Sequence, residues 1–219
     1  AEMKLEANLA EVEAEAQMGG ERDQRQPAVI VDVDETVLDN SPFEIDGIAK
    51  GLTYTPQRWK EWTRQANARA LPGSVGFLQD AVSRGCAVYY ITNRDADEKS
   101  STMQNLIAAG FPMVDSAHVM TREDGSDKTA RRARVSALHR VVLLVGDQLT
   151  DFDERFKDRS VDQGRATVDA MADTLLQYFV LLPNPMYGVW RDAVSGSGRG
   201  ATDSSKVARM NAFFERMDH

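Results

Sequence analysis

Residues 28–42 read AVIVDVDETVLDNSP, an apolar run followed at once by a dense group of acids. Four apolar residues suited to the interior of a sheet lead directly into Asp32, and Asp34, Glu35 and Asp39 follow within eight positions. Two carboxylates about 4 Å apart oppose each other by roughly 4 kcal/mol at an intermediate effective dielectric constant. So much negative charge at the end of a buried strand needs a cation to offset it. The stretch therefore predicts a strand whose end places acidic side chains in a cation-binding site.

Strand and helix patterns alternate along the rest of the chain. Apolar runs predict buried strands at 86–92, 140–147 and 178–183, with a short one at 117–121. Amphipathic patterns predict helices at 73–85, 95–110, 126–139 and 165–178. Continuous apolar strands that alternate with amphipathic helices are typical of a doubly wound parallel α/β sheet covered on both faces.

The chain is expected to divide into three segments, of which the second contains this pattern. Residues 1–26 predict a helix and a polar linker, and residues 27–192 the α/β core. Residues 40–71 lack strand signals and predict a small helical cap inserted in the core, with Thr55 capping a helix that begins at Pro56. Residues 193–219 predict a loop and a last helix near 203–216, and we interpret SGSGRG at 195–200 as a flexible loop rather than a phosphate-binding one.

Composition excludes several classes of function. The 219 residues are 42% hydrophobic, which suits one globular domain, and carry a formal charge of −8. An acidic chain is a poor partner for a nucleic-acid polymer. No apolar run is long enough for a membrane span, and no targeting segment is recognisable. Cys86, the single cysteine, excludes an intrachain disulfide and is expected to be buried; a homodimer stays open.

Polar side chains stand where several predicted strands end. Asp32 and Asp34 end the first strand, Thr92 the second, and Asp147 the run RVVLLVGD. Because ligands of open parallel sheets bind at the carboxyl ends of the strands, these side chains predict one shared site. Carboxylates without His or Cys favour Mg²⁺ as the cation. Lys128, near a helix start, is either a phosphate partner or part of a solvated face; for Arg131, Arg132 and Arg134 we expect the solvated face.

The ordered motifs resemble those of the haloacid dehalogenase superfamily of phosphotransferases. DVDET at 32–36 is similar to its first motif, ITNR at 91–94 to its second, Lys128 to its third, and GDQLTDF at 146–152 to its fourth. The longer strings DVDETVLDNSPF, YTPQRWKEW, LPGSVGFL and LPNPMYGVW resemble the class C acid phosphatases, which are bacterial lipoprotein nucleotidases. The resemblance covers roughly residues 27–192.

The resemblance implies a role for each matching residue. Asp32 would be the nucleophile that forms an aspartyl-phosphate, and Asp34 the general acid and base, with its carboxyl free to gain and lose a proton. Asp32, the backbone carbonyl of Asp34, Asp147 and Asp151 would hold Mg²⁺. The phosphoryl oxygens would be held by Thr92, Asn93 and Lys128.

The substrate expected from the resemblance is a small phosphomonoester. Phe43, Trp59 and Tyr187 would line the leaving-group site, which favours nucleoside 5′-monophosphates or nicotinamide mononucleotide. For Trp59, packing between the insertion helix and the core stays open. For Trp62 and Trp190 we expect packing roles. The resemblance also implies a bacterial periplasmic or outer-membrane location, although the lipid-anchoring cysteine of the family is absent from this sequence.

Two other interpretations share the fold. A signalling receiver domain also gathers aspartates, a threonine and a lysine around Mg²⁺, but its first acids are adjacent, whereas Asp32 and Asp34 are two apart. A binding protein whose catalysis has decayed would require loss of the nucleophile, and Asp32 is present. The sequence therefore favours the phosphatase.

Overall fold

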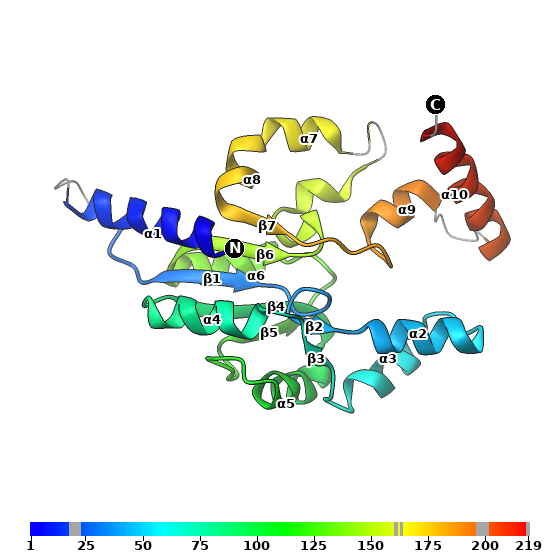
Figure 1. The fold of residues 1–219 in the computed structure, drawn as a ribbon, viewed down its shortest axis with the longest axis horizontal. Coiled ribbons are helices and arrows are strands. Elements are labelled where there is room, and N and C mark those ends of the chain that lie inside the picture. Colours follow the sequence, from blue (N-terminus) through cyan, green and yellow to red (C-terminus); the bar gives the residue numbers. More distant parts are fainter. Residues whose placement is uncertain (18–22, 160–161, 163, 196–201, 218–219) are drawn as a thin grey trace.

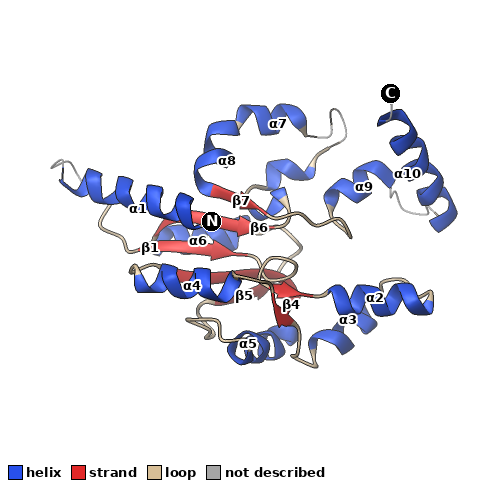
Figure 2. Cartoon of the chain, in the orientation of Figure 1, coloured by secondary structure: helices blue, strands red, loops and turns tan. Residues whose placement is uncertain are grey.

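The computed structural model describes all residues except 18–22, 160–161, 163, 196–201 and 218–219. At its centre is a parallel sheet of five strands in the order β5-β4-β1-β6-β7 (Figure 2). The strands are β1 (Pro27–Val31), β4 (Ala87–Asp95), β5 (Val119–Arg122), β6 (Arg140–Gly146) and β7 (Phe179–Leu181). The predicted parallel α/β fold is confirmed.

The central strand β1 is buried on both faces, as its apolar sequence predicts. Val29 and Val31 face a core with helices α1 (Glu2–Gln17), α4 (Ser74–Ser83) and α5 (Lys99–Ala108). Ala28 and Ile30 face the opposite side and pack with Val135 of helix α6 (Thr129–Leu138). This alternation follows from the two-residue period of a strand, and it places helices on both faces of the sheet.

The pairing of β1 with its neighbours aligns the strand ends. Val31 is level with Tyr90 of β4 and Val145 of β6. The backbone N–H of Asp32 donates to the carbonyl of Val145 over 2.9 Å. The residues that follow β1 and β6 therefore emerge at the same edge of the sheet.

The predicted insertion forms a helical hairpin. Helices α2 (Ser41–Lys50) and α3 (Pro56–Thr63) lie beyond the carboxyl ends of the strands (Figure 1). Thr55 caps α3 as predicted, because its hydroxyl accepts the N–H of Arg58 over 3.2 Å. The expectation of no strand in this segment is wrong at its end, since β3 (Arg69–Ala70) pairs antiparallel with β2 (Leu38–Asp39) and ties the hairpin at its base. Two-residue strands are too short to leave a period in the sequence.

The C-terminal third of the chain differs in part from expectation. The helix predicted at 165–178 is two helices, α7 (Arg165–Ala170) and α8 (Ala172–Tyr178), separated at Met171. Helices α9 (Val189–Ser195) and α10 (Asp203–Met217) follow, the latter as predicted. The loop expected at 195–200 lies outside the described residues apart from Ser195. None of the described helices has the length and apolar content needed to cross a membrane.

Candidate active site

Three predicted metal ligands converge at the carboxyl edge of the sheet. Asp32 follows β1, Asp147 follows β6, and Asp151 ends a 3₁₀ turn (Leu149–Asp151). One carboxylate oxygen of each lies within 4.8 Å of the others, and all three side chains are buried. Residues 115 positions apart in the chain thus share one small volume.

The turn after β6 explains the spacing of the fourth motif. Asp151 folds back so that its Oδ2 accepts the backbone N–H of Gln148 over 2.9 Å. A Cβ on Gly146 would lie 2.5 Å from the same oxygen. Only glycine at 146 leaves room for this carboxylate, so the glycine and the second aspartate of the motif depend on each other.

Lys128 lies among these acids rather than on a solvated face. Its ammonium group contacts Oδ1 of Asp32 and lies 2.7 Å from Oδ1 of Asp151, and only 3% of the residue is exposed. Burial alone would lower the pKa of Lys128, but the charges of Asp151 and Asp32 outweigh it and raise this pKa. The lysine is therefore charged and offsets part of the acidic cluster.

One ammonium group does not balance three carboxylates. Burial raises the pKa of Asp32 well above its ordinary value, although Lys128 opposes the shift. Burial, followed by the charge of Asp151, raises the pKa of Asp147 to about 6. A group of buried oxygens whose charges are incompletely offset fits a hard divalent cation such as Mg²⁺.

Asp34 is placed differently from expectation. Its carboxylate is not free: it accepts hydrogen bonds from the guanidinium of Arg94, with Nη2 at 2.7 Å from Oδ1, and from Asn40 Nδ2 over 2.8 Å. The hydroxyl of Thr92 donates to Oδ2 over 3.3 Å. Arg94 is part of the second motif, ITNR, but the sequence did not predict this pairing, because a single sequence does not show which acid a buried arginine meets.

Helix α6 fixes the loops of the site through two arginines. Arg131, 3% exposed, donates to the carbonyl of Thr92 and to Oδ1 of Asn93, which lies 2.7 Å away. Arg132 donates to the carbonyl of Asp151 over 3.0 Å. The solvated face predicted for these two arginines is wrong. Arg134 is exposed and pairs with Glu123, so of these three arginines it alone lies on the predicted solvated face.

Glu35 is a half-buried acid that the sequence prediction left without a role. It has a positive φ of 60°, and its Oε1 accepts the N–H of Asn40 over 3.1 Å. The hydroxyl of Tyr187 contacts its other oxygen. Burial, and then the charge of Asp34, raises the pKa of Glu35 to about 9, so this carboxyl keeps its proton at pH 7. The feature of the sequence that could have identified Glu35 as a site residue is its position within the motif DVDET.

The family that this geometry belongs to is shown by comparison with known proteins. The family model described as HAD superfamily, subfamily IIIB (Acid phosphatase), matches residues 2–190. The chain belongs to this family. Its structure is similar to that of the class C acid phosphatase from Bacillus anthracis, with a TM-score of 0.82 and 33% identity over 96% of this chain and 87% of that one. A tungstate-bound structure of the Bacillus anthracis class C enzyme matches with a TM-score of 0.81 and 32% identity.

Curated plant proteins are similar over the same core. Acid phosphatase 1 of Solanum lycopersicum is 28% identical over 165 residues, which are 72% of this chain and 57% of that protein. A stem 31 kDa glycoprotein of Glycine max is 28% identical over 166 residues, 72% of this chain and 58% of that one. The matched region thus spans less than two thirds of these relatives.

In this member of the acid phosphatase family, aromatic side chains of the insertion lie next to the acids. Phe43 of α2 and Trp59 of α3 pack edge to face with ring centroids 5.3 Å apart. The guanidinium carbon of Arg94 lies 5.7 Å from the Trp59 ring centroid. Tyr54, not predicted as a site residue, joins the cluster 6.4 Å from Trp59. Because Arg94 also holds Asp34, the aromatic cluster and the acidic site are contiguous.

The two tryptophans expected to pack also make polar contacts. Trp62 Nε1 donates to Oδ1 of Asn40 over 2.8 Å, and the Asn40 amide holds Asp34. Trp190 Nε1 donates to the carbonyls of Asn184 and Tyr187, over 3.0 and 3.1 Å. Both tryptophans therefore stabilise the loops around the site of this phosphatase-family chain.

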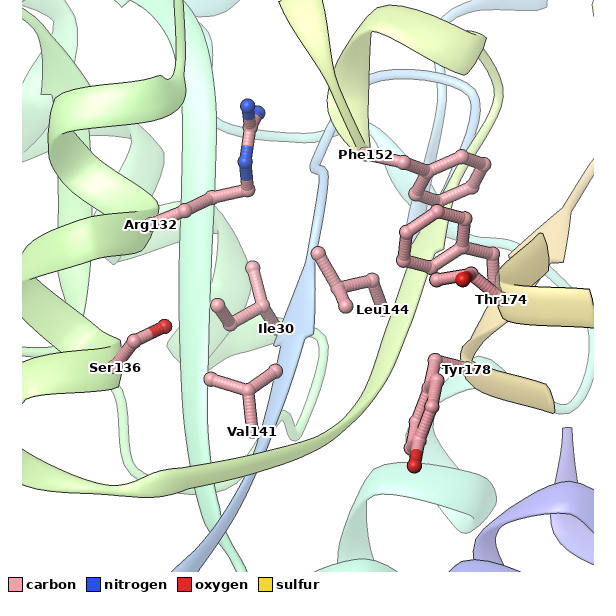
Figure 3. A pocket seen from close by; sticks show the side chains of 9 residues that line it. Ile30, Arg132, Ser136, Val141, Leu144, Phe152, Thr174 and Tyr178 are labelled. Carbon is pink, nitrogen blue, oxygen red and sulfur yellow. The ribbon is translucent and has the colours of Figure 1, made fainter. Parts of the chain in front are cut away.

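A pocket of about 280 Å³ lies apart from the acids, on the sheet face covered by α6 (Figure 3). Ile30, Val141 and Leu144 form its floor, with Arg132 on one side and Tyr178 on the other. None of the described residues that line it carries a carboxylate. We therefore place the candidate active site of this family member at the acidic cluster and not in this pocket.

Proposed function

We propose that this protein hydrolyses small phosphomonoesters in a Mg²⁺-dependent reaction through an aspartyl-phosphate on Asp32. The observation that carries the proposal is the buried group of Asp32, Asp147 and Asp151 around the ammonium of Lys128. The chain belongs to a family of acid phosphatases, and this membership supports phosphomonoester hydrolysis as the reaction class.

The same acids fit the metal in the proposed reaction. Asp32, Asp147 and Asp151 would hold Mg²⁺, together with the backbone carbonyl of Asp34. When bound, the cation offsets the repulsion between these carboxylates and an anionic phosphate. Lys128 would hold phosphoryl oxygens as a point charge, and Thr92 and Asn93 would contribute further contacts.

The chemical steps follow from two aspartates. A carboxylate oxygen of Asp32 forms a bond to phosphorus as the ester P–O bond breaks, and the leaving oxygen takes a proton from Asp34. Asp34 then removes a proton from water, whose oxygen bonds to phosphorus as the bond to Asp32 breaks. Since Asp34 is paired with Arg94 in the structure, it must leave that pairing to carry the proton.

The aromatic cluster supports nucleoside 5′-monophosphates, or nicotinamide mononucleotide, as substrates. Trp59 of this cluster is partly exposed and buried Phe43 packs against it, while Tyr187 lies outside the cluster, where its hydroxyl contacts Glu35. Stacking of a base on an aromatic ring is worth about 1–3 kcal/mol in nucleic-acid complexes. That amount would favour a nucleotide over a compact phosphate.

A panel assay tests the proposal. Nucleoside monophosphates, nicotinamide mononucleotide and an aryl phosphate should each release phosphate with Mg²⁺ and not after complete chelation. Asp32→Asn should abolish turnover and the acid-stable phosphoprotein formed on rapid quenching. Asp39→Asn, in the same acidic stretch but outside the metal group, is the matched control and should keep both. Turnover that survives chelation, or survives in Asp32→Asn, would contradict the mechanism.

The location is proposed from the resemblance, and a homodimer is the proposed assembly. We place the protein in the bacterial periplasm or at the outer membrane, which cell fractionation with activity staining tests. The homodimer is tested by light scattering during size-exclusion chromatography.

A further inference from the structure

One oxygen of Asp147 receives two amide hydrogen bonds. Asn184 Nδ2 donates to Oδ2 over 2.7 Å, and Gln148 Nε2 donates to the same atom over 2.9 Å. In the part of the chain that the structure describes, no donor makes a hydrogen bond to Oδ1. The terminal torsion of an aspartate is broad when nothing holds it, so two donors on one oxygen select a single orientation of the carboxylate.

Asn184 is itself fixed by the loop that carries it. It is buried, and its Oδ1 accepts the backbone N–H of Met186 over 2.9 Å and that of Tyr187 over 3.3 Å. With the carbonyl end of the amide committed to the loop, the NH₂ end points to Asp147. The loop thus specifies the direction of the donor.

Gln148 is fixed against the same loop. Its Nε2 also lies 3.3 Å from the carbonyl of Tyr187, which accepts a hydrogen bond from it. Gly188 has a φ of 134°, and a Cβ there would lie 2.1 Å from Oε1 of Gln148. A glycine at 188 is therefore what lets the Gln148 amide lie between the loop and Asp147.

We propose that Asn184 and Gln148 are positioning residues that hold the Asp147 carboxylate ready for a divalent cation shared with Asp32 and Asp151. This inference rests on the proposed function, because that function supplies the metal. Partners behind a metal ligand orient it, and their loss typically weakens metal affinity by about 10–100-fold. The role is one of orientation, since neither amide belongs to the acidic group itself.

The test measures Mg²⁺ and Mn²⁺ affinity without substrate. Calorimetric titration with Mg²⁺ and electron paramagnetic resonance of Mn²⁺ are applied to Asn184→Ala and to Gln148→Met, which removes an amide at nearly constant length. Met186→Leu is the matched control, because Met186 is exposed in the same loop and its hydrogen bond to Asn184 comes from the backbone N–H, which the substitution keeps. Circular dichroism checks that each variant is folded.

We expect each amide variant to raise the dissociation constant roughly tenfold or more. The double variant should lose less binding free energy than the sum of the losses in the two single variants, because both amides bond to the same oxygen. Met186→Leu should stay close to wild type. Unchanged affinity in folded Asn184→Ala and Gln148→Met, or an equal loss in Met186→Leu, would overturn the inference. If wild-type protein binds neither cation, the metal-dependent function fails instead, so the two failures are distinguishable.

Discussion

Replacing Lys128 by methionine should destabilise the metal-free protein strongly. The lysine is 3% exposed and compensates Asp32 and Asp151, so its removal leaves buried carboxylates without their cation. Breaking a buried ion pair from one side costs about 3–5 kcal/mol. For a chain of this length, each kcal/mol lowers Tm by about 2–4 °C, which gives a fall of roughly 6–20 °C.

The loss should depend on pH in a defined direction. Lys128 opposes the upward shift of the Asp32 pKa, so without it this pKa rises further. A carboxyl group whose pKa is raised by folding destabilises the protein as pH rises, because the unfolded chain releases its proton first. The deficit should therefore be small near pH 5 and larger near pH 8.

The assay is thermal unfolding by circular dichroism in excess chelator at both pH values. Arg134→Met is the control, since it removes a cation of the same helix from an exposed pair that contributes little. Added Mg²⁺ should raise the Tm of Lys128→Met by more than it raises the Tm of the wild-type protein. Equal Tm values for the two variants at pH 8 would refute the reasoning about the cluster.

Three further predictions address the metal and the leaving group. Gly146→Ala should weaken Mg²⁺ binding roughly tenfold or more, because its Cβ would lie 2.5 Å from Oδ2 of Asp151; an unchanged calorimetric titration would contradict this. The rise in Tm on adding Mg²⁺ should grow between pH 5 and pH 7, since a raised Asp147 pKa of about 6 lets protons compete with the cation below that value; a rise independent of pH would count against it. Trp59→Ala should lower kcat/KM for nucleoside monophosphates roughly tenfold and for a small aryl phosphate much less; equal losses would make Trp59 structural.

The sheet could be predicted from the sequence because its strands are short, apolar and bounded by clear breaks. The run RVVLLVGD and the stretch before Asp32 carry that signal, and both are confirmed as parallel neighbours. The convergence of Asp32 and Asp147 then follows from topology, since parallel strands end at one edge. The short β2–β3 pair was missed because two residues cannot show a period.

The charged residues behind the site were harder to predict. Arg131 looks like a surface cation in the sequence, yet it is buried against Thr92 and Asn93. Arg94 lies in the second motif, but nothing in the sequence identifies Asp34 as its partner. Asn184 and Gln148 carry no charge pattern at all. Their partners depend on how loops meet after folding, which periodicity and composition do not encode.

The most direct test of the central claim is a crystal structure of the protein grown with Mg²⁺ and beryllium trifluoride, which mimics a phosphoryl group on an aspartate. We expect the beryllium atom of the trifluoride to be bonded to a carboxylate oxygen of Asp32, and a cation to be shared by Asp32, Asp147 and Asp151. Beryllium bonded to another side chain, or a cation that does not touch both Asp32 and Asp147, would contradict the central claim.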